Sequence, residues 1–333
     1  MTLHSERVFG ASLILASIAA IAQAAPAPAP APAPAPGATV KIEHSRGKFD
    51  FLRVDARRNR LLAAHEKDET EDVIDLKSRR VLARLKVGGA VDTAPDPESR
   101  YYYVSVQDPG RVAVIDAETL KEVKSIKTVG PTDAIIYEPK NHRVYVTHDE
   151  GAEVWVIDPS SAKVVGAVAI PGVPEFMVYD EQSDRIYLNI KDKDLVAVID
   201  PATDKVVKQW PTAPAHSPHG LAIDSARQRV YSAGANGKLV ALDMRSGSIA
   251  GTVDITGKVD QIAFDAAGGL VYCAGPDQLS IVRVDGGQLT SAGNIATAAS
   301  ARNVAVDPAT REVWTTYTDG TDSFAKSWRP PAH

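Results

Sequence analysis

The sequence predicts an all-β protein, a seven-bladed β-propeller of four-stranded blades whose last blade is closed by the N-terminal strand. Two observations support this fold. Each repeat of about 42 residues offers four short segments rich in β-branched and aromatic residues, separated by turn residues. An acidic residue closes the first segment of every repeat, at Asp55, Asp96, Glu138, Asp180, Asp224, Asp265 and Asp307. A four-stranded unit at this period is typical of a propeller blade.

The interior of each repeat follows the same order. A large apolar residue follows each acid at a constant spacing, at Leu62, Tyr103, Tyr145, Tyr187, Tyr231, Tyr272 and Trp314. A third segment ends in an acid, as in residues 114–116 and 156–158, and a fourth apolar segment follows. No helical periodicity interrupts these repeats, so strands are expected throughout.

The two ends of the chain complement each other. The sequence ends too soon after Asp307 to supply four further strands. Residues 39–46 align with a fourth strand, because Val40 lies one repeat length before Val81. We therefore expect the N-terminal strand to complete the last blade, which would hold both ends of the ring together.

The first residues predict a secretory signal peptide, residues 1–24. Arg7 precedes an apolar run, residues 8–21, and residues 22–24 supply the small-x-small pattern of a cleavage site. The run is about 14 residues long, which is short for a helix that crosses a bilayer. Cleavage would leave a mature chain without a transmembrane segment, in the periplasm or secreted. A retained membrane anchor is the alternative.

Residues 25–37 are predicted to be an Ala/Pro-rich linker, and residues 38–333 the propeller. Proline fixes φ and removes a backbone donor, so the linker is expected to stay outside any sheet and to favour polyproline II. It would act as a spacer or as a passive leader.

Composition limits the classes of partner. The net charge of -5 and the pI near 5.9 argue against a general polyanion binder, so nucleic acid is not expected as a partner. The single cysteine, Cys273, allows no intrachain disulfide and is expected to be a small buried residue. We expect a monomer.

The second strands read Arg143-Val144-Tyr145-Val146-Thr147, Arg185-Ile186-Tyr187-Leu188-Asn189 and Arg229-Val230-Tyr231. With the Val-Ile-Asp third strands, they resemble the YVTN-repeat, or YncE-like, β-propellers of bacterial envelopes. The resemblance covers nearly all of residues 39–328 and is specific for the family, but it says little about function, because many members are binding proteins of unknown ligand. No blade shows the Gly-His and Trp-Asp pairing of WD40 repeats, and the absence of Cys-x-x-Cys-His excludes covalent c-type haem.

Strand direction identifies one candidate face. The loops before the first strands and those after the second strands share a side of the ring, which we call the mouth face. Residues expected to bind a ligand there are Asp50, Asp92, Asp133, Glu175, His219, Asp260 and Arg302, with His65 and His148 at the ends of second strands. His142 falls in a turn on the opposite side and is not expected to contribute.

Two interpretations of these residues remain open. Converging carboxylates and imidazole would bind a cationic ligand or a divalent metal, with Asp133, Glu175, His219 and Asp260 as candidate metal ligands. Oxygen ligands suit Ca²⁺ or Mg²⁺, and imidazole admits Zn²⁺ or Mn²⁺. Alternatively, the acids only solvate a water-filled channel and cap turns.

The leading functional prediction is an exported binding or scaffold protein that recognises a ligand or envelope partner on the mouth face. The alternative is a metal-dependent hydrolase of the lactonase type, since lactonase propellers of similar architecture hold a divalent metal at this place. Such an ion would polarise a carbonyl and lower the pKa of a bound water. The chain has no Gly-x-Ser-x-Gly, Ser-x-x-Lys or His-Glu-x-x-His motif, so no catalytic residue is assigned.

Overall fold

The computed structural model describes residues 1–2 and 34–329. The predicted signal peptide from residue 3 onward and most of the predicted linker lie outside the described residues. Within the described ranges, no helix is long and apolar enough to cross a membrane.

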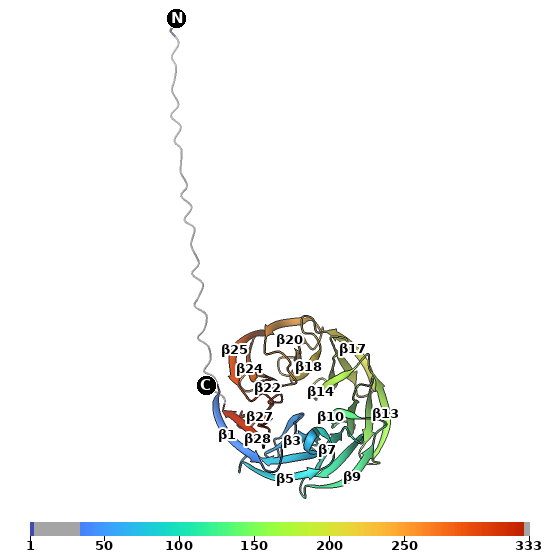
Figure 1. Ribbon diagram of the computed structural model, residues 1–333. Helices are drawn as coiled ribbons and strands as arrows, with labels where there is room; N and C mark the ends of the chain where they lie inside the picture. The colour runs from blue at the N-terminus through green and yellow to red at the C-terminus, as the bar shows by residue number, and fades with distance from the viewer. Residues whose placement is uncertain (3–33, 330–333) are drawn as a thin grey trace. The chain divides into compact units, whose positions relative to one another are not determined.

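Seven antiparallel sheets of four strands each surround a common axis, which confirms the predicted fold (Figure 1). The innermost strands are β2 (Leu52–Asp55), β6 (Ala90–Pro95), β10 (Thr132–Glu138), β14 (Pro174–Asp180), β18 (Pro218–Asp224), β22 (Gln261–Asp265) and β26 (Ala305–Val306). The second strands are β3 (Arg60–His65), β7 (Tyr101–Val106), β11 (Arg143–His148), β15 (Arg185–Ile190), β19 (Arg229–Gly234), β23 (Leu270–Gly275) and β27 (Val313–Thr318).

The outer half of each blade holds the third and fourth strands. The third strands are β4 (Thr70–Asp75), β8 (Arg111–Asp116), β12 (Glu153–Asp158), β16 (Leu195–Asp200), β20 (Lys238–Asp243), β24 (Gln278–Asp285) and β28 (Ser323–Arg329). The fourth strands are β5 (Arg80–Lys86), β9 (Lys121–Lys127), β13 (Lys163–Ala169), β17 (Lys205–Pro211), β21 (Ile249–Asp254), β25 (Gln288–Ala296) and β1 (Ala35–Ile42). In the described residues, the one helical element is the short 3₁₀ turn η1 (Glu66–Asp68).

The ring closes as predicted, because β1 pairs antiparallel with β28 at the outer edge of the last blade. Val40 lies opposite Ala325, and the Ala38 amide donates to the Ser327 hydroxyl at 2.9 Å. The expectation that proline keeps residues 25–37 out of the sheet is wrong for the last of them, since β1 already includes Pro36. An outermost strand tolerates proline because one side of it has no neighbour to bond.

The repeating acid has a structural role at the turn between the first two strands. The carboxylate of Asp55 accepts from the backbone amides of Arg57 and Arg58, at 3.1 and 3.3 Å. Glu138 accepts in the same way from the two residues that follow its turn proline. These buried acids satisfy turn amides that no strand bonds, which explains why every repeat carries one.

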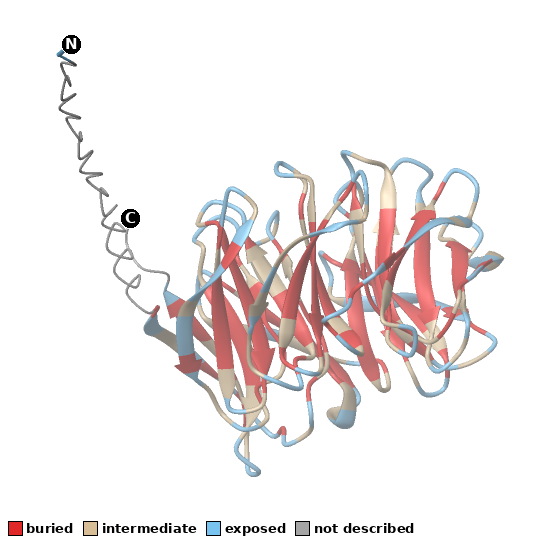
Figure 2. Ribbon diagram, turned by 90° about the horizontal axis from the view of Figure 1, so that it is seen from above, coloured by how far each residue is buried: buried red, intermediate tan, exposed pale blue. Residues whose placement is uncertain are grey.

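The core lies between neighbouring blades. The repeated aromatic position of the second strand is almost fully buried, from Tyr103 to Trp314, and Cys273 is buried as predicted. Figure 2 shows the buried segments along the middle of the strands and the exposed segments in the loops of both faces. The faces are therefore free to vary while the strand interiors hold the ring together.

Candidate functional site

Bulges in the inner strands present side chains at the mouth face. In β10 the pairing with β11 shifts by one residue between Thr132 and Ile135, and Asp133 lies inside the shift. Glu175 and His219 occupy the same place in the bulges of β14 and β18. A bulge adds one residue to a strand and redirects its side chain. The three predicted ligands thus share one local geometry in three successive blades.

Two phenylalanines form an apolar floor beneath these residues. Phe51 directly follows Asp50, and Phe176 directly follows Glu175. Their rings meet edge to face with centroids 4.8 Å apart, although they belong to the first and fourth blades, and both are buried. The guanidinium carbon of Arg53 lies 4.2 Å from the centre of the Phe176 ring. The mouth face therefore rests on apolar side chains, which lower the local dielectric constant.

Burial against this floor changes the acidity of Asp50. Burial raises the pKa of Asp50 to about 7, although the ammonium of Lys48 at 3.5 Å opposes the rise. The carboxylates of Asp260, Glu66 and Glu175 raise it further. At neutral pH about half of the Asp50 side chains hold a proton.

The pKa of Asp133 is shifted in the same direction as that of Asp50, and less positive charge lies nearby to oppose the shift. Burial raises the pKa of Asp133 well above its ordinary range, and the carboxylates of Glu175, Asp50 and Asp149 add to the rise. No ion pair joins Asp133 to a cation among the described residues. These effects favour the protonated form of Asp133, and a cation that reached it would be attracted by the neighbouring acids.

Two lysines, Lys48 and Lys191, lie beside the acids of the mouth face. Lys48 lies 3.4 Å from Glu66 as well as near Asp50. Lys191 lies 2.7 Å from a Glu175 oxygen, and the distances indicate a direct ion pair. Burial lowers the pKa of Lys191, but the nearby carboxylates more than offset this and hold it above its usual range.

The fourth predicted metal ligand, Asp260, is partnered as well. Arg302 Nε lies 3.6 Å from Asp260 Oδ2, so these two predicted site residues neutralise each other.

His219 directs one ring nitrogen toward Glu175. Its Nδ1 lies 2.7 Å from the carbonyl oxygen of Ser217, which can only accept, so Nδ1 carries the hydrogen. Nε2 lies 3.7 Å from Glu175 Oε1. In the neutral imidazole the Nε2 lone pair is thus available beside a carboxylate, as a ligand or base requires.

Asp92 stands at the predicted position, but the structure gives it a structural role in place of the predicted ligand contact. Its side chain has no exposed surface, and its two oxygens accept from Arg53 Nε and Nη2 at 2.8 and 2.6 Å. The Ile135 amide of the next blade donates to it at 3.1 Å. One carboxylate therefore joins the inner strands of the first three blades.

His65 is also turned inward. It is fully buried and stacks on Phe49 at 3.7 Å, with Nδ1 at 2.9 Å from Asp72 and Nε2 at 2.9 Å from the Gly47 carbonyl. The Ser45 hydroxyl lies within 3.4 Å of the ring. This buried network ties the segment after β1 to the first blade and leaves His65 no surface for a ligand.

His148 lies at the edge of the mouth face rather than in the cluster. Its ring stacks on Trp155 with centroids 4.6 Å apart, and Nδ1 lies 3.6 Å from Glu153. Across the described ranges, no three His, Cys, Asp or Glu side chains are arranged to hold one metal ion. We define the acidic cluster as the neighbouring mouth-face residues Asp50, Asp133, Glu175 and Asp260.

The sequence patterns missed the lysines of the mouth face. Lys191 follows directly after the second strand β15, where the chain returns to this face, and Lys48 precedes Asp50 in the loop before β2. Both positions could have been assigned to the face from strand direction. Their pairing with particular acids depends on side-chain geometry that the repeat does not encode.

A family model described as the cytochrome D1 heme domain matches residues 39–158. None of the curated proteins matches the chain. Among solved structures, hydrazine synthase from Kuenenia stuttgartiensis aligns with a TM-score of 0.73 and 14% identity over 86% of this chain and 96% of that one. A chain of a mitotic checkpoint complex aligns with a TM-score of 0.78 and 14% identity over 96% and 99%. These likenesses show the propeller fold.

Neither His65 nor His148 is placed to ligate a haem iron. Both ring nitrogens of His65 are bonded inside the protein, and the ring of His148 is covered by Trp155. The acidic cluster brings several carboxyl groups together, and the neighbouring carboxylates help to raise the pKa of Asp133. The chemistry of these residues suits a positively charged ligand.

Proposed function

We propose that this chain is a binding protein of the YVTN-repeat type whose mouth face recognises a cationic ligand. The observation that supports this most is Asp133, a partly buried carboxyl group with no ion-pair partner in the described chain, next to Glu175 and Asp50. Like charges crowded on an apolar floor are costly unless they are protonated or neutralised by a bound cation. The ligand would be a divalent metal ion or the ammonium group of a partner.

Binding of a cation is expected to release protons. The pKa of Asp50 is about 7 and that of Asp133 is raised by burial and by the neighbouring carboxylates, and a positive charge would stabilise the ionised forms of both. His219 Nε2 and Glu175 lie beside them and would complete the ligand's surroundings. Binding of a positively charged ligand would thus be accompanied by the loss of protons from the protein's own carboxyl groups.

The first test is a thermal melt of the purified protein with EDTA and then with Ca²⁺, Mg²⁺, Mn²⁺, Zn²⁺ or spermidine. A ligand at 100 times its Kd stabilises by about 2.7 kcal/mol, which is a shift of a few degrees for a domain of this size. Asp133→Asn should remove the shift. Asp285→Asn, an exposed acid on the opposite face, should preserve it. The absence of a shift with every cation would contradict the proposal.

Affinity for the cation should rise with pH through about 7. Protonated Asp50 and Asp133 compete with the cation, and both ionise more readily as the pH increases. Calorimetry in two buffers of different ionisation enthalpy would measure the proton release directly. An affinity that is flat over this range, without proton release, would show that the ligand does not contact these carboxyls.

Metal-dependent hydrolysis is the second candidate, and the orientation of His219 is the observation that favours it. A bound ion would supply an acidic water, and Nε2 could accept its proton. Lactone and ester substrates should be added to the metal-loaded protein. Turnover that is lost in His219→Ala but kept in His142→Ala would support the hydrolase, whereas binding without turnover would support recognition alone.

We also propose export to the periplasm or outside the cell, with residues 1–24 removed and residues 25–37 as a linker. The apolar run at residues 8–21 and the small residues that follow it support this. Mass spectrometry of the protein from its native envelope fraction should find Ala25 at the N-terminus. An uncleaved chain in the membrane fraction would instead indicate a retained anchor.

A further inference from the structure

A cavity of about 280 Å³ lies between the sixth and seventh blades. The sixth blade lines it with the end of β25 and the two residues that follow, Ala296, Thr297 and Ala298. The seventh blade lines it with alternate residues of its two middle strands, Thr315 and Tyr317 of β27 and Lys326 and Trp328 of β28. None of these residues belongs to the acidic cluster, so a ligand bound here is separate from the proposed cation site.

The loop after β25, which forms one wall of the cavity, is bonded to both blades. The Ser300 hydroxyl donates to the Thr318 carbonyl oxygen and accepts from the Thr318 amide, both at 3.0 Å. The Thr297 amide donates to the carbonyl oxygen of Asp277 at 2.9 Å. The cavity is therefore a fixed part of the fold.

Two polar atoms of the lining residues lack a hydrogen-bond partner. Trp328 Nε1 and Thr297 Oγ1 are both buried and have no partner among the described residues. Trp328 is only 5% exposed, so water does not replace the missing acceptor. By contrast, the indole group of Trp155 donates to Glu153 at 2.9 Å. Because buried donors are costly when unpaired, two of them beside one cavity indicate an acceptor supplied from outside the protein.

The charge that lines this cavity is positive. Lys326 forms no ion pair within the described part of the chain, and its ammonium lies 4.4 Å from the centre of the Trp328 ring. No lining residue is acidic. Asp277 contacts Thr297 through its backbone, and its exposed side chain is not part of the lining. An anion in the cavity would thus meet one uncompensated positive charge.

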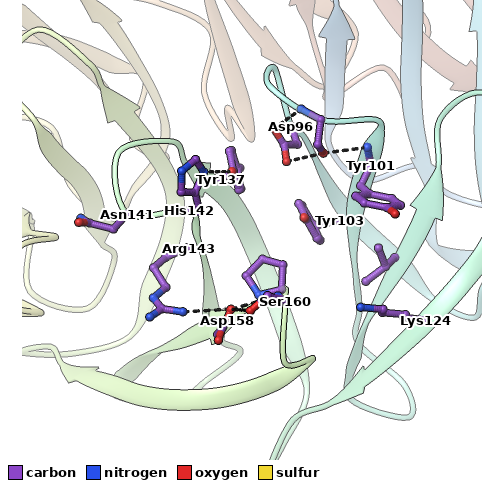
Figure 3. Close-up of a pocket in the computed structure, with 13 residues that line it drawn as sticks. Asp96, Tyr101, Tyr103, Lys124, Tyr137, Asn141, His142, Arg143, Asp158 and Ser160 are labelled. Atoms are coloured by element: carbon purple, nitrogen blue, oxygen red, sulfur yellow. Dashed lines mark hydrogen bonds and ion pairs between the residues drawn. The ribbon is translucent and has the colours of Figure 1, made fainter.

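A larger cavity, of about 540 Å³, lies between the second and third blades and differs in its charges (Figure 3). There Arg143 pairs with Asp158 at 3.2 Å, and Asp96 lines the wall as well as Lys124. Side chains of both signs line that cavity, so it does not select an anion.

We propose that the cavity between the sixth and seventh blades binds a small oxyanion, either free phosphate or sulfate or the carboxylate of a small organic acid. Its oxygens would accept from Trp328 Nε1 and Thr297 Oγ1, while Lys326 supplies the opposite charge. A water molecule takes up about 30 Å³, so the cavity admits a small ion and not a polymer.

The test is an NMR titration of the intact, isotope-labelled protein with phosphate, sulfate and acetate, each compared with chloride at the same ionic strength. The chain has four tryptophans, and the indole N–H signal that disappears in Trp328→Phe is that of Trp328. This signal should move saturably with at least one oxyanion and should not do so with chloride. The oxyanion that binds most tightly distinguishes a phosphate-type ligand from a carboxylate.

Two variants remove one contact each. Lys326→Met and Thr297→Val should each weaken oxyanion binding about tenfold, because one removes the charge and the other a donor. Melting curves would show that both variants are folded. A Trp328 signal that no oxyanion moves, or an unchanged affinity in either variant, would overturn the proposal.

The matched control is Lys208→Met. Lys208 and Trp210 are also two residues apart on one strand, with the ammonium 5.9 Å from the ring centre, but Lys208 donates to the Arg245 carbonyl at 3.1 Å. This variant should bind the oxyanion like the unmodified protein, and so should Asp133→Asn in the acidic cluster. An equal loss of affinity in Lys208→Met would mean that the anion responds to net charge and not to the cavity.

Discussion

Replacement of Asp92 with alanine is expected to destabilise the protein by about 3–5 kcal/mol, the usual cost of breaking a buried ion pair. The Arg53 side chain is only 20% exposed and would lose both of its bonds to the carboxylate. The Ile135 amide, which bonds the same carboxylate from the third blade, would lose its acceptor. The substitution thus leaves a charge and an amide without partners inside the ring.

Urea denaturation of the single and double variants would measure the effect. Because paired apolar replacement of a buried ion pair is often neutral, Arg53→Met with Asp92→Leu should recover most of the lost stability. Asp285→Asn, at an exposed turn, serves as the control and should unfold like the parent. If the Asp92→Ala protein were as stable as the parent, the assignment of Asp92 to blade packing rather than ligand contact would fail.

Deletion of residues 38–46 is expected to lower the melting temperature by roughly 10 °C. The segment carries Val40 and Ile42, which are buried against Phe49 and Trp314, and each buried aliphatic side chain contributes about 1.5–3 kcal/mol. It also carries Ser45, which contacts the buried His65 ring. Removal of the segment would leave β28 as an open edge.

A paired substitution separates packing from chain length in this test. Ile42→Asp places a charge in the core and should reproduce much of the loss, whereas Lys41→Ala on the exposed face of β1 should change the melting temperature little. Hydrogen exchange of β28 would show whether its amides lose protection. An unchanged melt after the deletion would mean that β1 does not stabilise the ring.

The sequence allowed the blades and their closure to be predicted because both depend on periodicity. The positions of Asp96 and Tyr103 recur at the same spacing in each blade. Burial of these positions in one blade therefore predicts burial of the equivalent positions in the others. The repeat pattern did not predict that Pro36 belongs to β1. Proline can join this strand because it is an edge strand, with a neighbouring strand on one side only.

The sequence was enough to predict where the mouth face lies, but not which of its charged side chains pair with one another. Asp92 and Asp133 look alike in the repeat, yet Arg53 neutralises only the first. That pairing depends on how two blades pack, and the spacing within one blade does not encode it. His142 lies on the opposite face, as predicted, where it lines a cavity between the second and third blades.

The pairing of β1 with β28 has a consequence for the order of folding. Val40 is made among the first residues of the propeller and Ala325 among the last, so their contact closes nearly the whole chain into one loop. The entropic cost of closure grows only with the logarithm of loop length, but contacts this remote in sequence form slowly. The six blades built from consecutive strands can assemble while the chain is incomplete, and the seventh must wait for both termini. A chain cut short by a few strands would thus leave six folded sheets in an open arc, with an unpaired edge available to a neighbouring molecule.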